Sequence, residues 1–551
     1  MTLTFSSPRN LTESLCQKDE SIPLIEEPIG TALLRAADRY GQQIALVDGA
    51  LDVDNRRSWT FEALASDAKR VAHALLERFA VGDHIALWAA NCPDWVLIEL
   101  GAAFAGIVLV PVNPAFLGRE LDHVLRKSAA RGIIVQDVYR GRNLVDVVAE
   151  IAGTLPELDA IVPLSTWKDF LGAATGEGSL PTVRANDMAQ IQFTSGTTGM
   201  PKGACLTHRG LANNGRIYAE AIGARSGDVW INPMPMFHTA GCGLVTLGAL
   251  QTGGAHVIPP GFKADDMLEL FERERGTIML CVPTMLIRIL DEQNQRPHAS
   301  ATWRLVSLGG APVPSDLVRR AQDRLGVEVA IGFGQTEASP YLTHTLVGDS
   351  HPNWMETVGL PLPQTEVKIV DPANGMIVPL GHPGEICGRG YGVMVGYFRD
   401  EAATASALDA DGWLHTGDIG SMDALGYCRV HSRLSDMIIR GGENIYPREV
   451  EDVLFAHSAI ANVAVFGLPD SEWGEVVAAC IQLHKDRNAT APELDAFCRN
   501  RLASYKKPSF YYFADTFPET ASGKIQKFTL RDRLLREKLS TSDSPRPRPD
   551  S

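Results

Sequence analysis

Short apolar strands alternate with amphipathic helices over most of the first two thirds of this chain. Between residues 29 and 162, helical stretches such as residues 61–79 separate strands such as residues 84–89 and 106–114. The alternation continues through further apolar segments that end in Gly or Pro, at residues 254–261, 276–283, 303–310 and 327–334. This pattern predicts a parallel or mixed sheet flanked by helices, with ligands at the carboxyl ends of the strands.

The pattern changes after about Val358 to short β segments separated by turn residues, which is typical of an antiparallel subdomain. A second change near Ser435 opens a compact α+β segment. We therefore predict an α/β fold with a large N-terminal domain of mixed β-sheets flanked by helices, plus an antiparallel β subdomain, over residues 1–434. A small α+β C-terminal domain is expected over residues 435–538, followed by a disordered tail over residues 539–551.

The composition narrows the range of partners. The chain has 551 residues and a formal net charge of −15, which repels nucleic acid and anionic membranes, so an anionic cofactor requires local basic groups. Its nine cysteines show neither a CxxC pair nor metal-ligand spacing, which fits a reducing compartment. We find no secretory leader and no apolar run of about 18 residues. A cytoplasmic protein without a transmembrane segment is expected.

The segment TSGTTGMPKG, residues 194–203, combines hydroxyl groups and glycines with one lysine. Glycine lets backbone N–H groups turn toward a ligand, Ser and Thr add hydroxyl donors, and Lys202 adds positive charge, as a polyphosphate requires. A Walker-type loop is excluded because Pro201 precedes Lys202 and Gly203 follows it. The loop is expected to join two strands, with a helix from about Leu211. A flexible surface loop is the alternative.

Two further motifs end in a carboxylate. In GFGQTE, residues 332–337, Phe333 can stack against a purine and Glu337 offers an oxygen ligand to Mg²⁺. In WLHTGD, residues 413–418, Asp418 follows a glycine turn and suits the two hydroxyls of a ribose. Taken singly, both have a structural alternative, a solvated Glu at a strand end and an Asp in a turn.

Residues 432–451 (SRLSDMIIRGGENIYPREVE) and 520–527 (TASGKIQK) complete the set of motifs. In order and spacing, the set resembles the adenylate-forming superfamily, which contains acyl-CoA and aryl-CoA synthetases, adenylation domains of peptide synthetases and firefly-type luciferases. The resemblance covers about residues 29–535. Because several independent motifs occur in the right order, chance is a poor explanation for the set.

The resemblance implies roles for individual residues. The ATP phosphates are expected at Thr194, Ser195, Gly196, Thr197, Thr198, Gly199 and Lys202. Adenine is expected at Gly310, Ala311, Pro312, Gly332, Phe333, Gly334, Gln335 and Thr336, with Asp418 at the ribose and Arg433 at the same nucleotide. Magnesium is expected at Thr194 and Glu337, and Lys524 matches the catalytic lysine of the small domain.

A carboxylic acid is already an anion at neutral pH and needs no general base, so repulsion between two negative reactants is the obstacle. Mg²⁺ and the Lys524 ammonium are expected to supply the positive charge. In relatives the small domain is mobile and rotates between the half-reactions. The pivot corresponds to Ser435, where relatives usually carry Asp or Lys. Coenzyme A is expected at Arg440, Gly441, Gly442, Glu443 and Lys506, with Lys507 as a second candidate for its phosphates. A solvated loop is the alternative for the two lysines.

Residues 234–243, MPMFHTAGCG, resemble the segment that gates the carboxylate pocket. The acyl pocket is expected at His238, Thr239, Gly241, Gly243 and Gly310, with His238 flanking the reacting carboxylate. Amino-acid-activating relatives usually carry an Asp where this chain has His238, so a buried ammonium would lack a counterion. The apolar residues 243–258 favour a helix beside a hydrophobic tunnel, and core packing explains them almost as well. The expected acid is hydrophobic: fatty, alicyclic or aryl.

The leading hypothesis is an ATP-dependent acid:CoA ligase that forms an acyl-adenylate and then a thioester, releasing AMP and pyrophosphate. The alternatives are an acyl-adenylating enzyme that loads a carrier-protein thiol, and a non-catalytic nucleotide-binding protein. Catalytic roles are expected for Lys524, His238 and Thr194. The expected cofactors are ATP, Mg²⁺ and coenzyme A, the expected partner is a small carboxylic acid, and a homodimer is one assembly that we consider.

Overall fold

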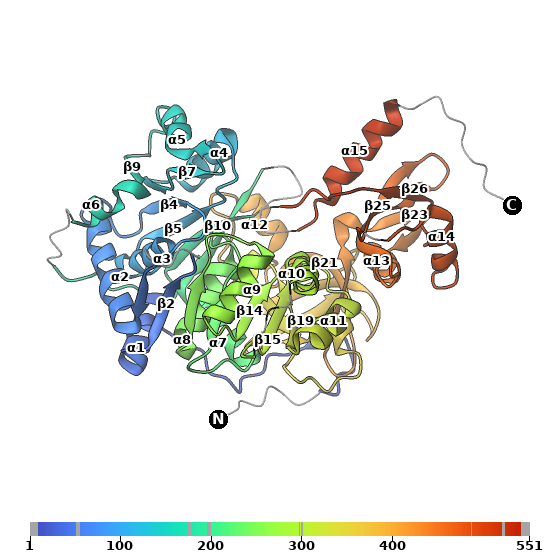
Figure 1. The fold of residues 1–551 in the computed structure, drawn as a ribbon, viewed down its shortest axis with the longest axis horizontal. Coiled ribbons are helices and arrows are strands. Elements are labelled where there is room, and N and C mark those ends of the chain that lie inside the picture. Colours follow the sequence, from blue (N-terminus) through green and yellow to red (C-terminus); the bar gives the residue numbers. More distant parts are fainter. Residues whose placement is uncertain are drawn as a thin grey trace. The chain divides into compact units, whose positions relative to one another are not determined.

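The computed structural model describes residues 9–50, 56–172, 178–194, 200–296, 298, 301–485, 487–520 and 524–540 (Figure 1). The chain divides into two compact units. The first unit contains residues 1–416 and 421–429, and the second contains residues 417–420 and 430–551. The predicted Ser195–Gly199 phosphate segment and the tail from residue 541 lie outside the described residues.

A six-stranded sheet in the first unit carries the phosphate motif. Its order is β11-β10-β5-β4-β6-β9, and its strands are β4 (His84–Trp88), β5 (Val108–Val112), β6 (Gly132–Val135), β9 (Ala160–Pro163), β10 (Met188–Thr194) and β11 (Lys202–Thr207). All neighbours pair in parallel except β10 and β11, which form an antiparallel pair. The phosphate motif therefore joins two strands, as predicted.

A nine-stranded mixed sheet carries the GFGQTE motif. Its order is β18-β17-β16-β15-β14-β12-β13-β2-β3, and its strands are β2 (Ile44–Asp48), β3 (Ser58–Thr60), β12 (Val229–Ile231), β13 (Ala255–Ile258), β14 (Ile278–Cys281), β15 (Leu305–Gly309), β16 (Glu328–Gly334), β17 (Tyr341–His344) and β18 (Leu360–Pro361). The strands from β2 to β16 pair in parallel and the outer pairs are antiparallel. Strands β15 and β16 are parallel neighbours, so their carboxyl ends lie at the same edge of the sheet.

A third sheet has the order β1-β19-β20-β21-β22. Its strands are β1 (Leu15–Cys16), β19 (Thr365–Val370), β20 (Gly384–Gly390), β21 (Leu414–Met422) and β22 (Cys428–Arg433). The pairs β1–β19 and β19–β20 are antiparallel, as predicted for this part of the chain. A small hairpin joins β7 (Val138–Tyr139) and β8 (Arg142–Asn143).

Helices separate and cover the sheets of the first unit. They are α1 (Ile29–Tyr40), α2 (Phe61–Leu76), α3 (Pro93–Ala105), α4 (Gly118–Ser128), α5 (Leu144–Ala152), α6 (Trp167–Gly172), α7 (His208–Ala221), α8 (Leu247–Thr252), α9 (Ala264–Arg273), α10 (Pro283–Gln295), α11 (Ser315–Leu325) and α12 (Glu401–Ala407). Helix α3 is apolar apart from Asp94 and Glu99, and all its residues except Asp94 are buried. It packs against α2 in a core shared with β2 and β4. Helix α7 begins at His208, three residues before the predicted start, because the Thr207 hydroxyl caps it by accepting from the Gly210 N–H at 3.0 Å.

The second unit is an α+β body with a sheet of order β24-β23-β26-β25, to which β27 adds in parallel. Its elements are β23 (Ile438–Arg440), β24 (Glu443–Ile445), α13 (Pro447–Phe455), β25 (Ile460–Asp470), β26 (Gly474–Leu483), α14 (Ala491–Arg499), β27 (Phe510–Phe513) and α15 (Lys527–Ser540). Pro447 opens α13, and Thr490 with Glu493 forms a capping box at α14. The core here joins β25, β26 and α15.

The predicted α/β fold class is confirmed. The boundary predicted between residues 434 and 435 stays a prediction. A search of the described helices for one that is long and apolar enough to cross a membrane finds none.

Candidate active site

The two strands β10 and β11 hold the ends of the phosphate motif. Thr194 ends β10 and Lys202 begins β11, and the two residues are paired across the hairpin. Both are partly exposed. A hydroxyl group and an ammonium group therefore stand together at the base of the segment predicted to bind phosphates.

Glu337 meets this hairpin from a different sheet. It lies in a short 3₁₀ helix (Thr336–Ala338) after β16 and is buried, with 7 % of its surface exposed. Its Oε1 accepts a hydrogen bond from the Thr194 hydroxyl at 3.2 Å and another from the Tyr397 hydroxyl at 2.8 Å. The Nζ atom of Lys202 lies 5.3 Å from the centre of the Tyr397 ring. The structure thus brings Thr194, Lys202 and Glu337 together, and Tyr397 touches both charged groups.

Sequence reasoning missed Tyr397. It follows Gly396 in a β-rich stretch in which aromatic residues commonly serve packing, so no local signal separated it from its neighbours. The pKa of the Tyr397 phenol is raised mainly by burial, and the negative charge of Glu337 raises it further. The phenol is therefore protonated at neutral pH and acts as a hydrogen-bond donor to the carboxylate.

The residues predicted around adenine come from adjacent strand ends. Gly309 of β15 pairs with Gly332 of β16, so residues 310–312 and residues 333–336 continue from neighbouring strands. A Cβ atom on Gly332 would lie 2.6 Å from the ring of Tyr341, so a side chain there would displace that ring. Gly310 has a φ of +75°, which favours glycine.

The segment before the predicted acyl pocket is held by a buried amide. Asn91 Nδ2 donates to the Met234 carbonyl at 2.9 Å, and Asn91 Oδ1 accepts from the Met236 N–H at 2.8 Å. Two residues later, His238 Nδ1 accepts from the Ala240 N–H at 3.2 Å. Sequence reasoning missed Asn91, although a polar residue between an apolar strand and a buried helix is a weak signal of such a role.

The chain after His238 forms a π-helix, Ala240–Thr246, and continues as α8. All residues of the π-helix are buried, as are Thr239, Gly241 and Gly243 among the predicted pocket residues. The Thr239 hydroxyl has no hydrogen-bond partner among the described residues. A Cβ on Gly241 would overlap the Pro235 carbonyl, so glycine is required by packing at that position.

A buried polar network lies between this π-helix and β10. Gln190 Nε2 donates to Glu99 Oε1 at 2.8 Å, and Gln192 Nε2 donates to Gln190 Oε1 at 2.7 Å and to Cys242 Sγ at 3.4 Å. Burial raises the pKa of Glu99 well above its usual range, which favours the neutral acid. Hydrogen bonds thereby connect β10, which leads to the phosphate motif, with the π-helix that follows His238.

In the second unit, Asp418 and Arg433 form an ion pair in which Arg433 Nε lies 3.6 Å from Asp418 Oδ1. Asp418 is buried and Arg433 is exposed. Ser435, the predicted pivot, is exposed in a short 3₁₀ helix (Leu434–Asp436), and its hydroxyl donates to Asp436 Oδ1 at 3.2 Å. A nucleotide role for the pair and a pivot at Ser435 stay predictions.

The residues predicted at coenzyme A form a β-hairpin. Arg440 pairs with Glu443 across β23 and β24, and Gly441 and Gly442 make the two-residue turn with φ values of +59° and +87°. Positive φ at both turn positions accounts for the two glycines. The Arg440 guanidinium donates to the Tyr505 carbonyl at 2.7 Å.

The lysines of the second unit differ in their surroundings. Lys506 Nζ donates to both carboxylate oxygens of Glu449 at 2.8 Å, and Lys507 forms an ion pair with Asp495. Lys524 lies just before α15, where its backbone N–H donates to the Thr520 hydroxyl at 3.0 Å and its carbonyl accepts from the Thr520 N–H at 2.7 Å. Lys506 is therefore paired with a carboxylate in this structure, and its coenzyme A role stays a prediction.

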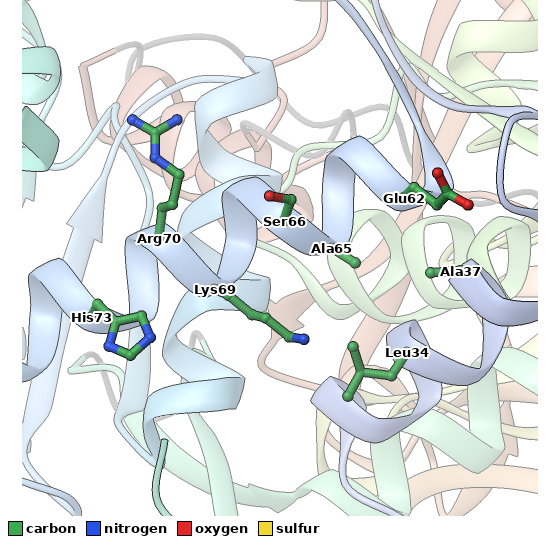
Figure 2. Close-up of a pocket in the computed structure, with 8 residues that line it drawn as sticks. All are labelled: Leu34, Ala37, Glu62, Ala65, Ser66, Lys69, Arg70 and His73. Carbon is green, nitrogen blue, oxygen red and sulfur yellow. The ribbon is translucent and has the colours of Figure 1, made fainter. Parts of the chain in front are cut away.

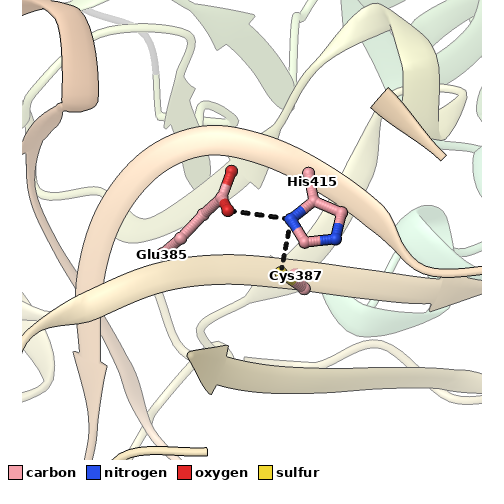
Figure 3. A group of neighbouring side chains, drawn as sticks. All are labelled: Glu385, Cys387 and His415. Carbon is pink, nitrogen blue, oxygen red and sulfur yellow. Dashed lines mark hydrogen bonds and ion pairs between the residues drawn. The ribbon is translucent and has the colours of Figure 1, made fainter. Parts of the chain in front are cut away.

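Two other features of the first unit lie outside the predicted site. Figure 2 shows a hollow lined by side chains of α1 and α2, among them Leu34, Lys69 and His73, and it contains no predicted site residue. Figure 3 shows His415 Nδ1 between Glu385 Oε2 at 2.8 Å and Cys387 Sγ at 3.5 Å.

These three residue types are metal ligands, but the contacts of the group favour a structural role. His415 Nε2 lies 3.7 Å from Asp409 Oδ2, and Lys368 Nζ lies 3.9 Å from the same oxygen. Burial raises the pKa of the Cys387 thiol to about 12, which keeps it protonated. We interpret the group as a polar network, held by hydrogen bonds, in the third sheet.

Glu337 and Thr194 fit a magnesium ion by donor type. Magnesium prefers oxygen ligands, and here a carboxylate and a hydroxyl lie 3.2 Å apart at the phosphate hairpin. The carboxylate is buried and is hydrogen-bonded to neutral hydroxyl groups, which orient it. These observations agree with the predicted metal role without testing it.

Comparison with known proteins identifies the family. Residues 33–398 match the family described as AMP-binding enzyme, and residues 449–524 match the AMP-binding enzyme C-terminal domain. The chain is 37 % identical over 544 residues to YngI of Bacillus subtilis (strain 168), covering 93 % of this chain and 98 % of that protein. It is 33 % identical over 547 residues to the mitochondrial medium-chain acyl-CoA ligase ACSF2 of Homo sapiens, covering 93 % and 88 %.

The fold comparison agrees. The ATP-bound crystal structure of MatB from Rhodopseudomonas palustris superposes with a TM-score of 0.83 at 28 % identity, covering 92 % of this chain and 99 % of that one. Sequence and fold matches both extend over nearly the whole chain. The chain belongs to the AMP-binding enzyme family, as an AMP-forming acid:CoA ligase that uses ATP and coenzyme A.

Proposed function

We propose that this ligase activates a hydrophobic carboxylic acid, of the fatty, alicyclic or aryl class, through an acyl-adenylate. The observation that carries the proposal is the buried wall after His238. The π-helix Ala240–Thr246 and the first turn of α8 are buried and mainly apolar. An acid bound beside such a wall gains free energy by removing its own apolar surface from water.

The charge of this region supports the same class of substrate. His238 stands where amino-acid-activating relatives carry an Asp, so this position supplies no counterion for an ammonium group. The nearby carboxyl group of Glu99 is raised in pKa by burial and is neutral. Acids with a second charge near the carboxylate are therefore expected to be poor substrates. The medium-chain name of the ACSF2 relatives agrees with a hydrophobic acid.

We propose the residue roles within the first unit as follows. The phosphates contact residues 194–202, adenine lies at Gly310–Pro312 and Gly332–Thr336, and the acid lies at His238, Thr239, Gly241, Gly243 and Gly310. Lys202 and Thr194 stand together at the hairpin, where an ammonium and a hydroxyl donor stabilise negative phosphoryl oxygens. A magnesium ion bound at Glu337 and Thr194 would neutralise the charge of the triphosphate.

In the second unit, we propose that Asp418 and Arg433 hold the nucleotide and that Lys524 stabilises the charge that develops at the α-phosphoryl group. Rotation at Ser435 between the half-reactions would then exchange Lys524 for Arg440, Gly441, Gly442 and Glu443 at the acyl centre. Lys506 would bind a coenzyme A phosphate after leaving Glu449. The domain boundary at residue 435 belongs to this proposal.

A panel of acids tests the substrate class. Acid-dependent AMP production is measured with ATP, Mg²⁺ and coenzyme A for octanoate, cyclohexanecarboxylate, benzoate, malonate and phenylalanine. Octanoate or one of the two cyclic acids is expected to exceed malonate and phenylalanine in kcat/KM by at least about 100-fold, because burying an unpaired charge costs several kcal/mol. A preference for malonate or phenylalanine would refute the proposal.

The same assay separates the two acceptors. For a ligase that uses free coenzyme A, omission of coenzyme A abolishes steady AMP release. If AMP release is insensitive to free coenzyme A and rises on addition of a carrier protein, the carrier-loading alternative is correct. The homodimer and the cytoplasmic location stay predictions.

A further inference from the structure

The segment that follows β20 is fixed against the phosphate hairpin. The Phe398 N–H donates to the Gly203 carbonyl at 2.8 Å, and the Cys205 N–H donates to the Gly396 carbonyl at 2.9 Å. The Tyr397 N–H donates to the Thr404 hydroxyl at 2.8 Å. The backbone of Tyr397 is therefore bound on both sides, to β11 and to α12.

The hydroxyl group and the ring of Tyr397 contact different residues. The hydroxyl group donates to Glu337 Oε1 at 2.8 Å, and the ring face lies 5.3 Å from Lys202 Nζ. The Thr194 hydroxyl donates to the same oxygen of Glu337 at 3.2 Å. Two donors on one oxygen fix the rotation of the carboxylate, and this also fixes the direction of the second oxygen.

We propose that Tyr397 is a positioning residue for nucleotide binding. Its hydroxyl group holds the Glu337 carboxylate in the orientation that binds magnesium, and its ring supports the Lys202 ammonium beside the phosphates. Tyr397 itself touches neither the nucleotide nor the acid in this role. The inference rests on the proposed function, because it requires Glu337 to be a magnesium ligand.

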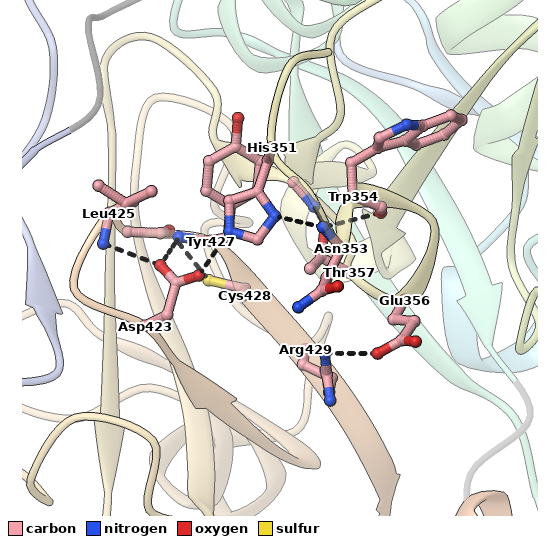
Figure 4. Close-up of polar contacts among 12 residues, drawn as sticks. His351, Asn353, Trp354, Glu356, Thr357, Asp423, Leu425, Tyr427, Cys428 and Arg429 are labelled. Carbon is pink, nitrogen blue, oxygen red and sulfur yellow. Dashed lines mark hydrogen bonds and ion pairs between the residues drawn. The ribbon is translucent and has the colours of Figure 1, made fainter. Parts of the chain in front are cut away.

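The chain offers a matched control for the hydroxyl group. Tyr427 donates to Asp349 Oδ1 at 2.7 Å, and its ring stacks on His351 with centroids 4.1 Å apart. Figure 4 shows Tyr427 with His351 and Asp423, and none of the residues labelled there is a predicted site residue. The Y427F substitution therefore removes a phenol-to-carboxylate hydrogen bond of the same kind in the same unit, without touching Glu337 or Lys202.

The experiment measures ATP binding by calorimetry, without acid or coenzyme A, as a function of Mg²⁺ concentration. Y397F keeps the ring beside Lys202 and removes the hydroxyl group, so the Mg²⁺ concentration for half-maximal ATP binding is expected to rise about tenfold. Y397L also removes the ring, so ATP affinity at saturating Mg²⁺ is expected to fall further, by about threefold. Y427F is expected to match the wild type in both measurements.

A Mg²⁺ dependence of Y397F equal to that of Y427F would overturn the inference. The E337Q variant tests the proposed function separately. If ATP binding by E337Q shows the wild-type Mg²⁺ dependence, then Glu337 is not a magnesium ligand and the inference about Tyr397 is wrong as well. T404A provides a second route if Y397F does not fold, because it removes the hydrogen bond from the Tyr397 N–H to α12 and keeps the phenol. A rise in the Mg²⁺ requirement supports the inference there too, and no rise overturns it.

Discussion

The Asn91 amide gives the sharpest test of how the acid site is built. Asn91→Ala removes both hydrogen bonds that hold the backbone of Met234 and Met236, at 2.9 Å and 2.8 Å. A buried backbone group that loses its partner costs about 1–3 kcal/mol. The two groups together predict a loss of about 2–6 kcal/mol in the free energy of unfolding. The loss lies toward the lower value if water fills the space left by the Asn91 amide.

Asn213 supplies the control, because its amide also bonds a backbone N–H and a backbone carbonyl of a distant segment, besides a bond to the Arg209 carbonyl within its own helix. Its Nδ2 donates to the Ile25 carbonyl and its Oδ1 accepts from the Ile25 N–H, both at 2.9 Å. Asn213→Ala should therefore lose a comparable amount of stability. Urea unfolding followed by tryptophan fluorescence measures both variants against the wild type.

The two variants should differ in catalysis. Of these two residues, Asn91 alone bonds the chain that leads into His238, so N91A is expected to lower kcat/KM for the acid by about tenfold, equivalent to about 1.4 kcal/mol. N213A should stay within about twofold of the wild type in acid-dependent pyrophosphate exchange. Equal kcat/KM values for the two variants, at matched folded fractions, would refute the argument that Asn91 positions the acid site.

Three further outcomes follow from the same structure. Lys524→Ala should lower acid-dependent pyrophosphate exchange by at least roughly 10²-fold, and unimpaired exchange would remove Lys524 from the mechanism. Ser435→Pro should preserve pyrophosphate exchange and block thioester formation, whereas equal loss of both activities would count against rotation there. Burial lowers the pKa of His208 to about 4 and of His256 to about 3, below the value of about 6.5 in the unfolded chain. Unfolding at pH values between 6.5 and 5 therefore takes up protons, so the free energy of unfolding should fall as the pH is lowered, by up to about 1.4 kcal/mol per pH unit for each histidine. Urea titrations over this pH range measure the slope. A free energy of unfolding that does not change with pH would contradict this.

Several parts of the candidate site could be predicted because their signal is local. The glycine-rich hairpin between β10 and β11, and Glu337 just after β16, follow from residue types within about ten positions of one another. Asn91 and Tyr397 carry no such signal. Each acts on residues more than fifty positions away, so its partner depends on which elements become neighbours in the fold.

The sequence by itself determined the alternation of strands and helices, the change to antiparallel segments and the order of the motifs, because periodicity and turn residues act over short distances. Only the tertiary structure decided which side chains form hydrogen bonds to the same atom. Thr194 and Glu337 are 143 residues apart, and each follows or ends a strand of a different sheet. The hydroxyl groups of Thr194 and Tyr397 nevertheless meet at one carboxylate oxygen of Glu337. The physical reason is that such contacts depend on sheet order and packing, which no local pattern encodes.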